Sequence, residues 1–192
     1  MLRKNAKLGT ILAMGLFCAG ANAAPETYKI DPGHTSVIAS WSHFGFSHPT
    51  AAFNGAEGTI TFDADSPEDA KISVSMDVET VDSFVEKLNE EFLGKDYFDV
   101  ESHPKATFKS TKVVAKGGDK YDVHGDLTIK GITKPVVMHA TLNKQGKHPM
   151  NQKPTVGFDA EAEIMRSEFG LGKYVPNVGD KVKLRITTEA QQ

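Results

Sequence analysis

Most of the chain alternates between apolar and polar residues with a period of two. Between residues 71 and 79, Ile72, Val74, Met76 and Val78 alternate with lysine, serine, aspartate and glutamate. This period is typical of a β-strand with one buried and one solvated face. Similar patterns cover residues 28–30, 35–44, 58–62, 106–112, 123–129, 136–142, 156–164 and 182–188. The sequence therefore predicts an all-β fold of about eight antiparallel strands or slightly more.

Turn-forming residues separate these segments. Residues 116–119 (Lys-Gly-Gly-Asp) and Gly131 are typical of hairpin connections. The pairs Asn54-Gly55 and Glu57-Gly58 indicate a bend or bulge inside one long hairpin arm. Long antiparallel strands with short turns favour a closed barrel, because closure removes the exposed strand edges that recruit other chains. A β-sandwich is the alternative architecture.

One segment changes period. Apolar residues recur at helical spacing at Val81, Phe84, Val85, Leu88 and Phe92. Ser83 and Glu86 form a possible capping box, and Gly94 can end the helix. We therefore expect one short amphipathic helix, followed by an aromatic-rich stretch over residues 95–104. Its apolar face either covers a barrel opening that admits a hydrocarbon or simply seals the core.

The inward-facing positions of the predicted strands mix very small and very large side chains. A tightly packed interior leaves few voids, so a barrel lined at several levels by alanine is underfilled unless aromatic rings from opposite strands meet. Composition alone favours a filled barrel and a barrel that holds an apolar ligand equally. In the second case we expect the ligand to contact Val37, Ala39, Trp41, His43, Phe62, Met76, Phe84, Leu88, Phe92, Phe98, Phe108, Met138, Ala140, Phe158, Ala160 and Phe169.

The first residues predict a secretory signal peptide over residues 1–23. Arg3, Lys4 and Lys7 precede an apolar run from Leu8 to Gly20, and the small residues of Ala21-Asn22-Ala23 follow. We therefore expect residues 24–192 to form one domain in the periplasm or outside the cell. The chain's one cysteine lies within the predicted signal peptide, which excludes disulfides and thiol catalysis from that domain. The formal net charge of -3 argues against nucleic-acid binding.

Candidate catalytic and metal sites are weakly supported. The seven histidines do not show a recognised metal-ligand spacing. His43 is the exception of interest, because it shares the inward face with Trp41 near one barrel end and could bind a carbonyl or hydroxyl group. We find neither a G-x-S-x-G motif nor paired inward carboxylates. We therefore expect no catalytic activity, no metal and no catalytic cofactor, although a histidine-dependent enzyme acting on a lipid and a filled barrel acting through surface contacts remain open.

Five segments together resemble the YceI-like family of exported bacterial proteins. They are DPGHTSVIASWSHFGF, FNGAEGTITFD, FDVESHPKATFKST, HGDLTIKGITKPV and RSEFGLGKYVPNVGDKVKLRI, in this order. The resemblance covers nearly all of residues 24–192. It implies a lipocalin-like antiparallel barrel whose elongated apolar cavity holds a polyisoprenoid or an isoprenoid quinone. It therefore implies binding, storage or transport of that lipid. No apolar run after residue 23 is long enough to cross a bilayer, so we expect no stable membrane insertion. Transient contact with a membrane or a membrane protein, and the oligomeric state, a homodimer included, remain open.

The predicted helix departs from the family pattern. Where many members carry D-x-H-L-[RK], this chain has Asn89-Glu90-Glu91-Phe92-Leu93. A histidine and a basic residue are thus replaced by Glu91 and Leu93. This change favours a neutral or quinone-like head group over a pyrophosphate.

Overall fold

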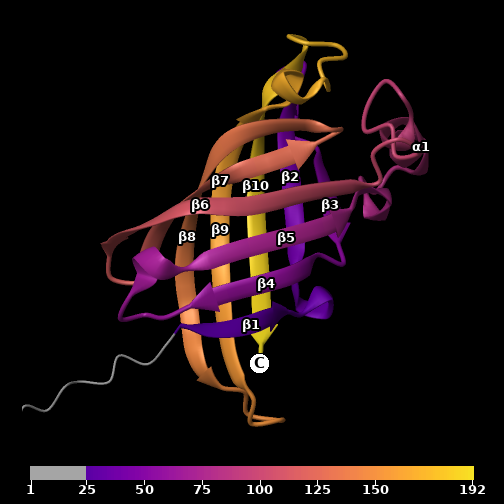
Figure 1. The fold of residues 1–192 in the computed structure, drawn as a ribbon. Helices are drawn as coiled ribbons and strands as arrows, with labels where there is room; N and C mark the ends of the chain where they lie inside the picture. Colours follow the sequence, from indigo (N-terminus) through magenta and orange to yellow (C-terminus); the bar gives the residue numbers. More distant parts are fainter. Residues whose placement is uncertain (1–24) are drawn as a thin grey trace, which may run out of the picture.

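A computed structural model describes residues 25–192, and the predicted signal peptide lies outside the described residues. These residues form ten strands and one α-helix (Figure 1). The strands are β1 (Glu26–Ile30), β2 (Ser36–His43), β3 (Thr50–Asn54), β4 (Glu57–Phe62), β5 (Lys71–Asp77), β6 (Lys105–Gly117), β7 (Lys120–Ile129), β8 (Ile132–Lys147), β9 (Pro154–Met165) and β10 (Val178–Gln191). The helices are α1 (Glu86–Leu93) and four short 3-10 turns, η1 (Pro32–His34), η2 (Pro67–Asp69), η3 (Val78–Thr80) and η4 (Arg166–Phe169).

Eight of the strands form a closed antiparallel ring. The order is β1-β4-β5-β6-β7-β8-β9-β10, and β10 pairs with β1 to complete the circle. This closing pair is short, with Lys29 opposite Gln191 and Ile30 opposite Ala190. The predicted closed barrel is therefore confirmed, and the sandwich alternative is wrong.

The hairpin of β2 and β3 adds to this ring at one end. The last part of β10 pairs with β1, whereas residues from Val178 to Thr187 pair with β2. Strand β3 pairs with β2 and is joined to the segment before α1 by reciprocal backbone bonds between Ala52 and Asp82, both 2.8 Å. The prediction that Asn54-Gly55 interrupts a single hairpin arm is wrong, because β3 and β4 pair with different strands.

The helix begins later than its sequence pattern predicts. Ser83 does not cap it. Its backbone N–H and its hydroxyl both donate to Oδ1 of Asn89, at 2.7 and 2.6 Å. The backbone N–H of Phe84 donates to the Asp82 carboxylate at 2.8 Å, and Phe84 takes the left-handed conformation with φ 63°. Helix α1 therefore starts at Glu86 and ends before Gly94, as the glycine predicts.

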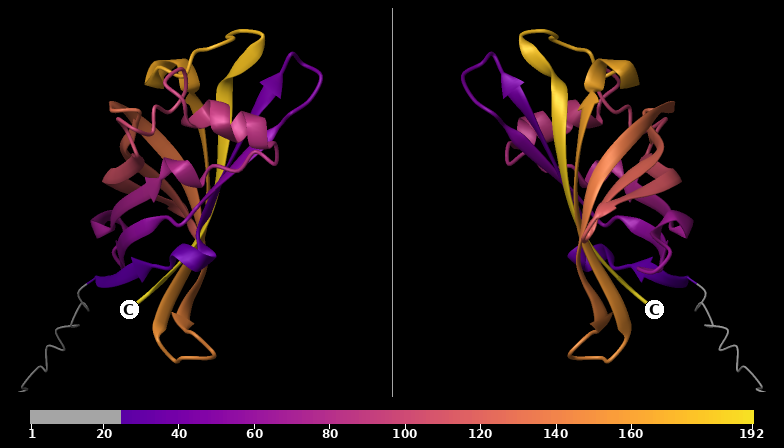
Figure 2. Two further views of the ribbon diagram at one scale, coloured as in Figure 1. Left: turned by 90° about the vertical axis from the view of Figure 1, so that its right-hand side faces the viewer. Right: turned by 90° about the vertical axis from the view of Figure 1, so that its left-hand side faces the viewer.

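Two groups of buried side chains lie at opposite ends of the barrel. At the β1 end, the ring of Phe62 meets Tyr121 and Phe158 edge-on, with centroids 5.7 and 5.3 Å apart. At the other end, Trp41 meets Phe92 of α1 edge-on, with centroids 5.8 Å apart. Figure 2 shows α1, the β2–β3 connection and η4 gathered at this second end, while the β8–β9 connection extends from the first. We call the α1 end the mouth.

Gly58 allows β4 and β5 to approach closely. Its φ is +147°, and a Cβ atom there would lie 2.0 Å from the carbonyl oxygen of Ser73. We expect Gly58→Ala to lower the free energy of unfolding by at least about 2 kcal/mol, because backbone must shift to admit the methyl group. Urea denaturation measures this change. Gly146→Ala in β8 is the control, since open space surrounds that position, and an equal loss in both variants would contradict the close-approach argument.

Candidate functional site

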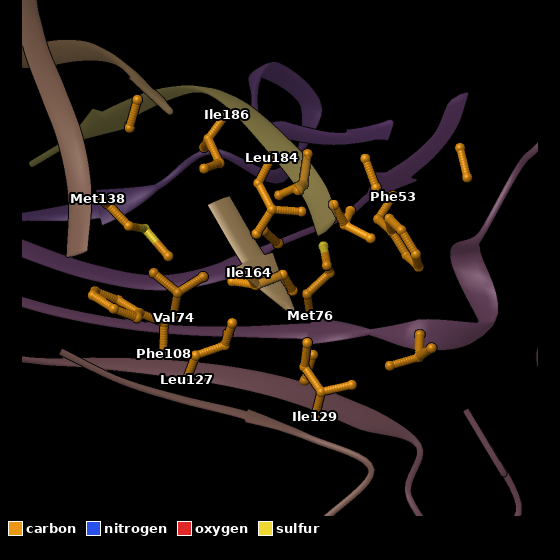
Figure 3. A pocket seen from close by; sticks show the side chains of 18 of the residues that line it. Phe53, Val74, Met76, Phe108, Leu127, Ile129, Met138, Ile164, Leu184 and Ile186 are labelled. Carbon is orange, nitrogen blue, oxygen red and sulfur yellow. The ribbon is translucent and has the colours of Figure 1, made fainter. Parts of the chain in front are cut away.

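The barrel encloses an apolar cavity of about 730 Å³. Its lining runs from Ile30 and Tyr121 at the β1 end to His43 and Tyr174 at the mouth, and every strand contributes to it. Figure 3 shows lining side chains from several strands pointing into this space, with only carbon and sulfur atoms in view. The volume falls within the range of small-molecule sites, about 300–1,000 Å³.

Alanine residues on neighbouring strands leave this space open. Ala140 of β8 pairs with Ala160 of β9, and Ala39 of β2 pairs with Ala51 of β3. All four side chains line the cavity. Two adjacent methyl groups cover little of the distance to the opposite wall, so the aromatic rings across the barrel do not fill it. Of the two interiors that the composition allows, the structure has the hollow one.

Most of the residues predicted to contact a ligand line this cavity. They are Val37, Ala39, Trp41, His43, Phe62, Met76, Leu88, Phe92, Phe98, Phe108, Met138, Ala140, Phe158 and Ala160. Their parity in the strands and their spacing in α1 bring them to one surface. Whether each of them touches a ligand stays a prediction.

Two predicted residues do not line the cavity. Phe84 is 76% exposed, because the turn at Asp82 and Ser83 places it before the helix instead of on its apolar face. Phe169 is buried, yet its ring does not line the cavity. It belongs to a groove outside the barrel that Ile38 and Pro135 also line. The η4 turn separates Arg166, which lines the cavity, from Phe169, which does not.

Aromatic rings surround the mouth. The ring of Phe92 contacts Tyr97 and Phe98 with centroid distances of 5.2 and 6.1 Å, and Phe53 contacts Phe98 at 5.7 Å. Burial raises the pKa of Tyr97 above its ordinary value, so its hydroxyl stays protonated. Phe53 is not among the predicted contacts, because it lies in β3 and the sequence pattern predicts no strand there.

Arg166 is a buried cation in the cavity wall that the predicted residues do not include. It is 7% exposed, and its guanidinium donates to the carbonyl oxygens of Gly179 (2.9 Å), Leu171, Lys173 (2.9 Å) and Val178 (2.8 Å). Burial lowers its pKa from the ordinary arginine value. These bonds tie the β9–β10 connection to η4. A single arginine followed by a glycine-rich segment does not form a sequence pattern that predicts these bonds.

Charged groups are sparse in this lining, where Glu91 and Arg166 are the charged side chains of the described residues. Within residues 25–192, no three histidine, cysteine, aspartate or glutamate side chains gather closely enough to hold a metal ion. His139 instead bonds the Asp122 carboxylate at 2.7 Å on the outer face of the barrel. No helix in the same residues has the length and apolar character needed to span a membrane.

An empty interior predicts that added volume is tolerated inside the cavity. In protein from which any bound apolar ligand has been extracted, we expect Ala160→Phe to change the free energy of unfolding by less than about 1 kcal/mol, because the ring enters open space. Ala190→Phe is the matched control, since Ala190 is fully buried against Tyr28 and Val156 outside the cavity lining. Overpacking there destabilises by about 1–3 kcal/mol. Urea denaturation compares the two, and an equal loss for Ala160→Phe would contradict a hollow barrel.

Known proteins resemble this chain in both sequence and fold. The model of the YceI-like domain matches residues 28–190. Protein YceI of Escherichia coli O157:H7 is 35% identical over 191 residues, which cover 98% of each chain. The crystal structure of BcnA from Burkholderia cenocepacia superposes with a TM-score of 0.76 at 29% identity, over 84% of this chain and 99% of BcnA.

A more distant neighbour shows the same fold. It is a polyisoprenoid binding domain from Saccharophagus degradans, with a TM-score of 0.65 and 12% identity over 85% of this chain and 97% of that one. At this identity the likeness establishes the barrel architecture. The family-model match and the full-length similarity to protein YceI establish the relationship by sequence. The chain belongs to the YceI-like family.

Proposed function

We propose that the protein binds one long-chain isoprenoid lipid, of the polyprenyl or quinone type, and catalyses no reaction on it. The observation that carries this proposal is the apolar cavity of about 730 Å³, which runs from the β1 end to the mouth. An elongated hydrocarbon fits a space of this shape and chemistry. The name of the Saccharophagus degradans domain, a polyisoprenoid binding domain with the same fold, supports the ligand class.

Burial of the hydrocarbon supplies the binding free energy. Removing apolar surface from water contributes about 25 cal/mol per Å². A chain of several isoprene units therefore gains on the order of 10 kcal/mol before the costs of ordering the chain are subtracted. The cavity wall itself is built of strands, so little of that gain is lost in ordering the protein.

The lining favours a neutral head group. Glu91 contributes a carboxylate at the mouth, which repels a pyrophosphate. The buried Arg166 already donates to four backbone carbonyls. His43, Tyr97 and Tyr174 also line the mouth, and each can bond a quinone carbonyl or a polyprenol hydroxyl.

A place in the periplasm, with storage or transport as the physiological role, completes the proposal. The signal-peptide pattern of residues 1–23 supports export. A lipid with a long hydrocarbon chain needs a protein container to cross an aqueous compartment. The sparse charge of the lining supports a container instead of a catalyst, because acid–base catalysis needs positioned titratable groups.

Protein purified without detergent tests the proposal. We expect organic extraction to release one isoprenoid lipid for each folded chain, because the apolar cavity favours a bound hydrocarbon over water. Mass spectrometry of the extract identifies the chain length and the head group. Extraction of Ala160→Phe, in which the new ring occupies the cavity, is the control. An empty wild-type barrel that also fails to take up an added polyprenol would contradict the proposal.

Trp41 provides a spectroscopic test of the head group. It is the single tryptophan of the chain, and its ring lines the cavity near the mouth. Because quinones quench indole fluorescence at short range, we expect an isoprenoid quinone to quench the emission in a saturable titration. A polyprenol of equal chain length should shift the emission without quenching it. Equal quenching in Ala160→Phe would show that the quinone acts from outside the cavity.

A further inference from the structure

Five large apolar side chains are exposed around the mouth. Phe44 and Phe46 lie in the β2–β3 connection, Phe84 and Val85 precede α1, and Tyr174 lies in the β9–β10 connection. Their exposed fractions are 53%, 93%, 76%, 54% and 58%, in that order. We call these five residues the rim. Large apolar groups clustered at one end of a molecule mark a contact surface.

Three rim residues hold an unfavourable backbone conformation. The φ angles of Phe44, Phe84 and Tyr174 are 52°, 63° and 65°. Residues with bulky side chains seldom adopt the left-handed region, which glycine and asparagine adopt at lower cost. Each site thus combines backbone strain with an aromatic ring exposed to water. Neither feature stabilises the folded chain, and strain of this kind is concentrated at functional positions.

Hydrogen bonds connect two of the three rim segments. The backbone N–H of Phe44 donates to the carbonyl of Asn177 at 2.9 Å, and the N–H of Val178 donates to the carbonyl of Tyr174 at 2.9 Å. The β2–β3 and β9–β10 connections therefore present their aromatic rings together. Figure 2 shows both connections at the end of the molecule opposite the β8–β9 turn.

The distribution of charged residues around the rim indicates the kind of surface that it contacts. Residues 42–56 and 174–179 contain no aspartate, glutamate, lysine or arginine. Charged side chains are costly inside a bilayer, whereas phenylalanine and tyrosine are favoured at its boundary. Around Phe84, the neighbouring charges are the acidic Asp82 and Glu86 and the basic Lys87. Beside Tyr174, Lys173 places its Nζ 5.3 Å from the ring centroid and is paired with the Asp96 carboxylate at 2.8 Å. The rim therefore suits the apolar boundary of a bilayer and lacks the lysine and arginine cluster that attracts anionic lipids.

The rim is continuous with the cavity. Val85 and Tyr174 belong both to the exposed rim and to the cavity lining. A hydrocarbon that leaves a bilayer beneath the rim therefore passes along apolar side chains until it is inside the barrel. We propose that the rim inserts into the surface of a lipid bilayer and holds the mouth against it. The purpose of this docking, loading and release of the lipid, rests on the proposed function.

Flotation with vesicles of pure phosphatidylcholine tests the docking. We expect the wild-type protein to float with the vesicles and the triple variant Phe44→Gly, Phe46→Ser, Phe84→Gly to lose binding by about tenfold or more, since three inserted rings are removed. Addition of phosphatidylglycerol or of salt should change wild-type binding less than about twofold. Met150→Ser is the matched control, because Met150 is 89% exposed in the β8–β9 turn.

Thermal unfolding separates docking from folding. The two glycine substitutions relieve strain at positive φ, so the triple variant should unfold at the same temperature as the wild type or higher. If it fails to fold, Phe46→Ser alone decides, since it removes the most exposed ring of the rim at a residue without positive φ. Wild-type protein that does not float, or variants that float equally well, would overturn the proposal. So would a wild-type dimer in sedimentation that the triple variant abolishes while vesicle binding is absent.

A second variant distinguishes docking from lipid binding. Ala160→Phe alters the cavity and leaves the rim intact, so it should float as the wild type does and yield no lipid on extraction. The triple variant should still bind a polyprenol supplied in detergent solution, as measured by Trp41 emission. Flotation without any extracted lipid would leave the docking standing and overturn the proposed function. Extracted lipid without flotation would support the proposed function and overturn the docking.

Discussion

The sharing of one edge of β10 between two partners determines the shape of this barrel. Over Ala190 and Gln191 that edge pairs with β1 and closes the ring, whereas over Val178 to Thr187 it pairs with β2. The η1 turn between β1 and β2 makes the change of partner possible. The hydroxyls of Thr35 and Thr188 bond at 2.9 Å at this point, and the Asp31 N–H donates to the Glu189 carbonyl at 2.8 Å. The barrel is thus drawn together at one end and widened by an additional hairpin at the other.

The cavity follows from this geometry and from side-chain size. At the narrow end the rings of Phe62, Tyr121 and Phe158 contact one another edge-on. The Ala140–Ala160 pair of β8–β9 lies beside these rings, since Ala140 is also paired with Tyr121, whereas the Ala39–Ala51 pair of β2–β3 belongs to the mouth end. Small residues therefore leave space both beside the aromatic rings of the narrow end and nearer the mouth, and the cavity extends through both parts.

The sequence predicted the barrel well, because strand period and inward parity are local properties. Strands from Lys71 to Asp77 and from Pro154 to Met165 lie where alternation places them. Strand β3 was missed because five residues between turns give too short a pattern to distinguish from a loop. The residues assigned to the inner face by strand parity line the cavity.

The errors in the site arise from hydrogen bonds and turns that the spacing of apolar residues does not report. Phe84 has helical spacing, yet hydrogen bonds of Ser83 to Asn89 and of Phe84 to Asp82 delay the helix and turn the ring outward. Phe169 and Arg166 are three residues apart in a 3-10 turn, and only the folded chain determines which of them lines the cavity. The carbonyl partners of Arg166 come from a connection whose path the sequence pattern does not specify.

The reciprocal bonds of Ala52 and Asp82 have a mechanical consequence for the barrel wall. Strand β3 lies beside β5 without forming a ladder with it. Those two hydrogen bonds, and the bonds of the Thr80 hydroxyl to the backbone of Asn54, therefore join the wall where most other neighbours share longer ladders. Stiffness around the circumference is therefore unequal, and this seam is more compliant than the parts of the wall that long ladders join. At this seam, the width of the cavity near the mouth depends on side-chain contacts instead of backbone register. Ligands of different thickness can therefore fit inside the same barrel.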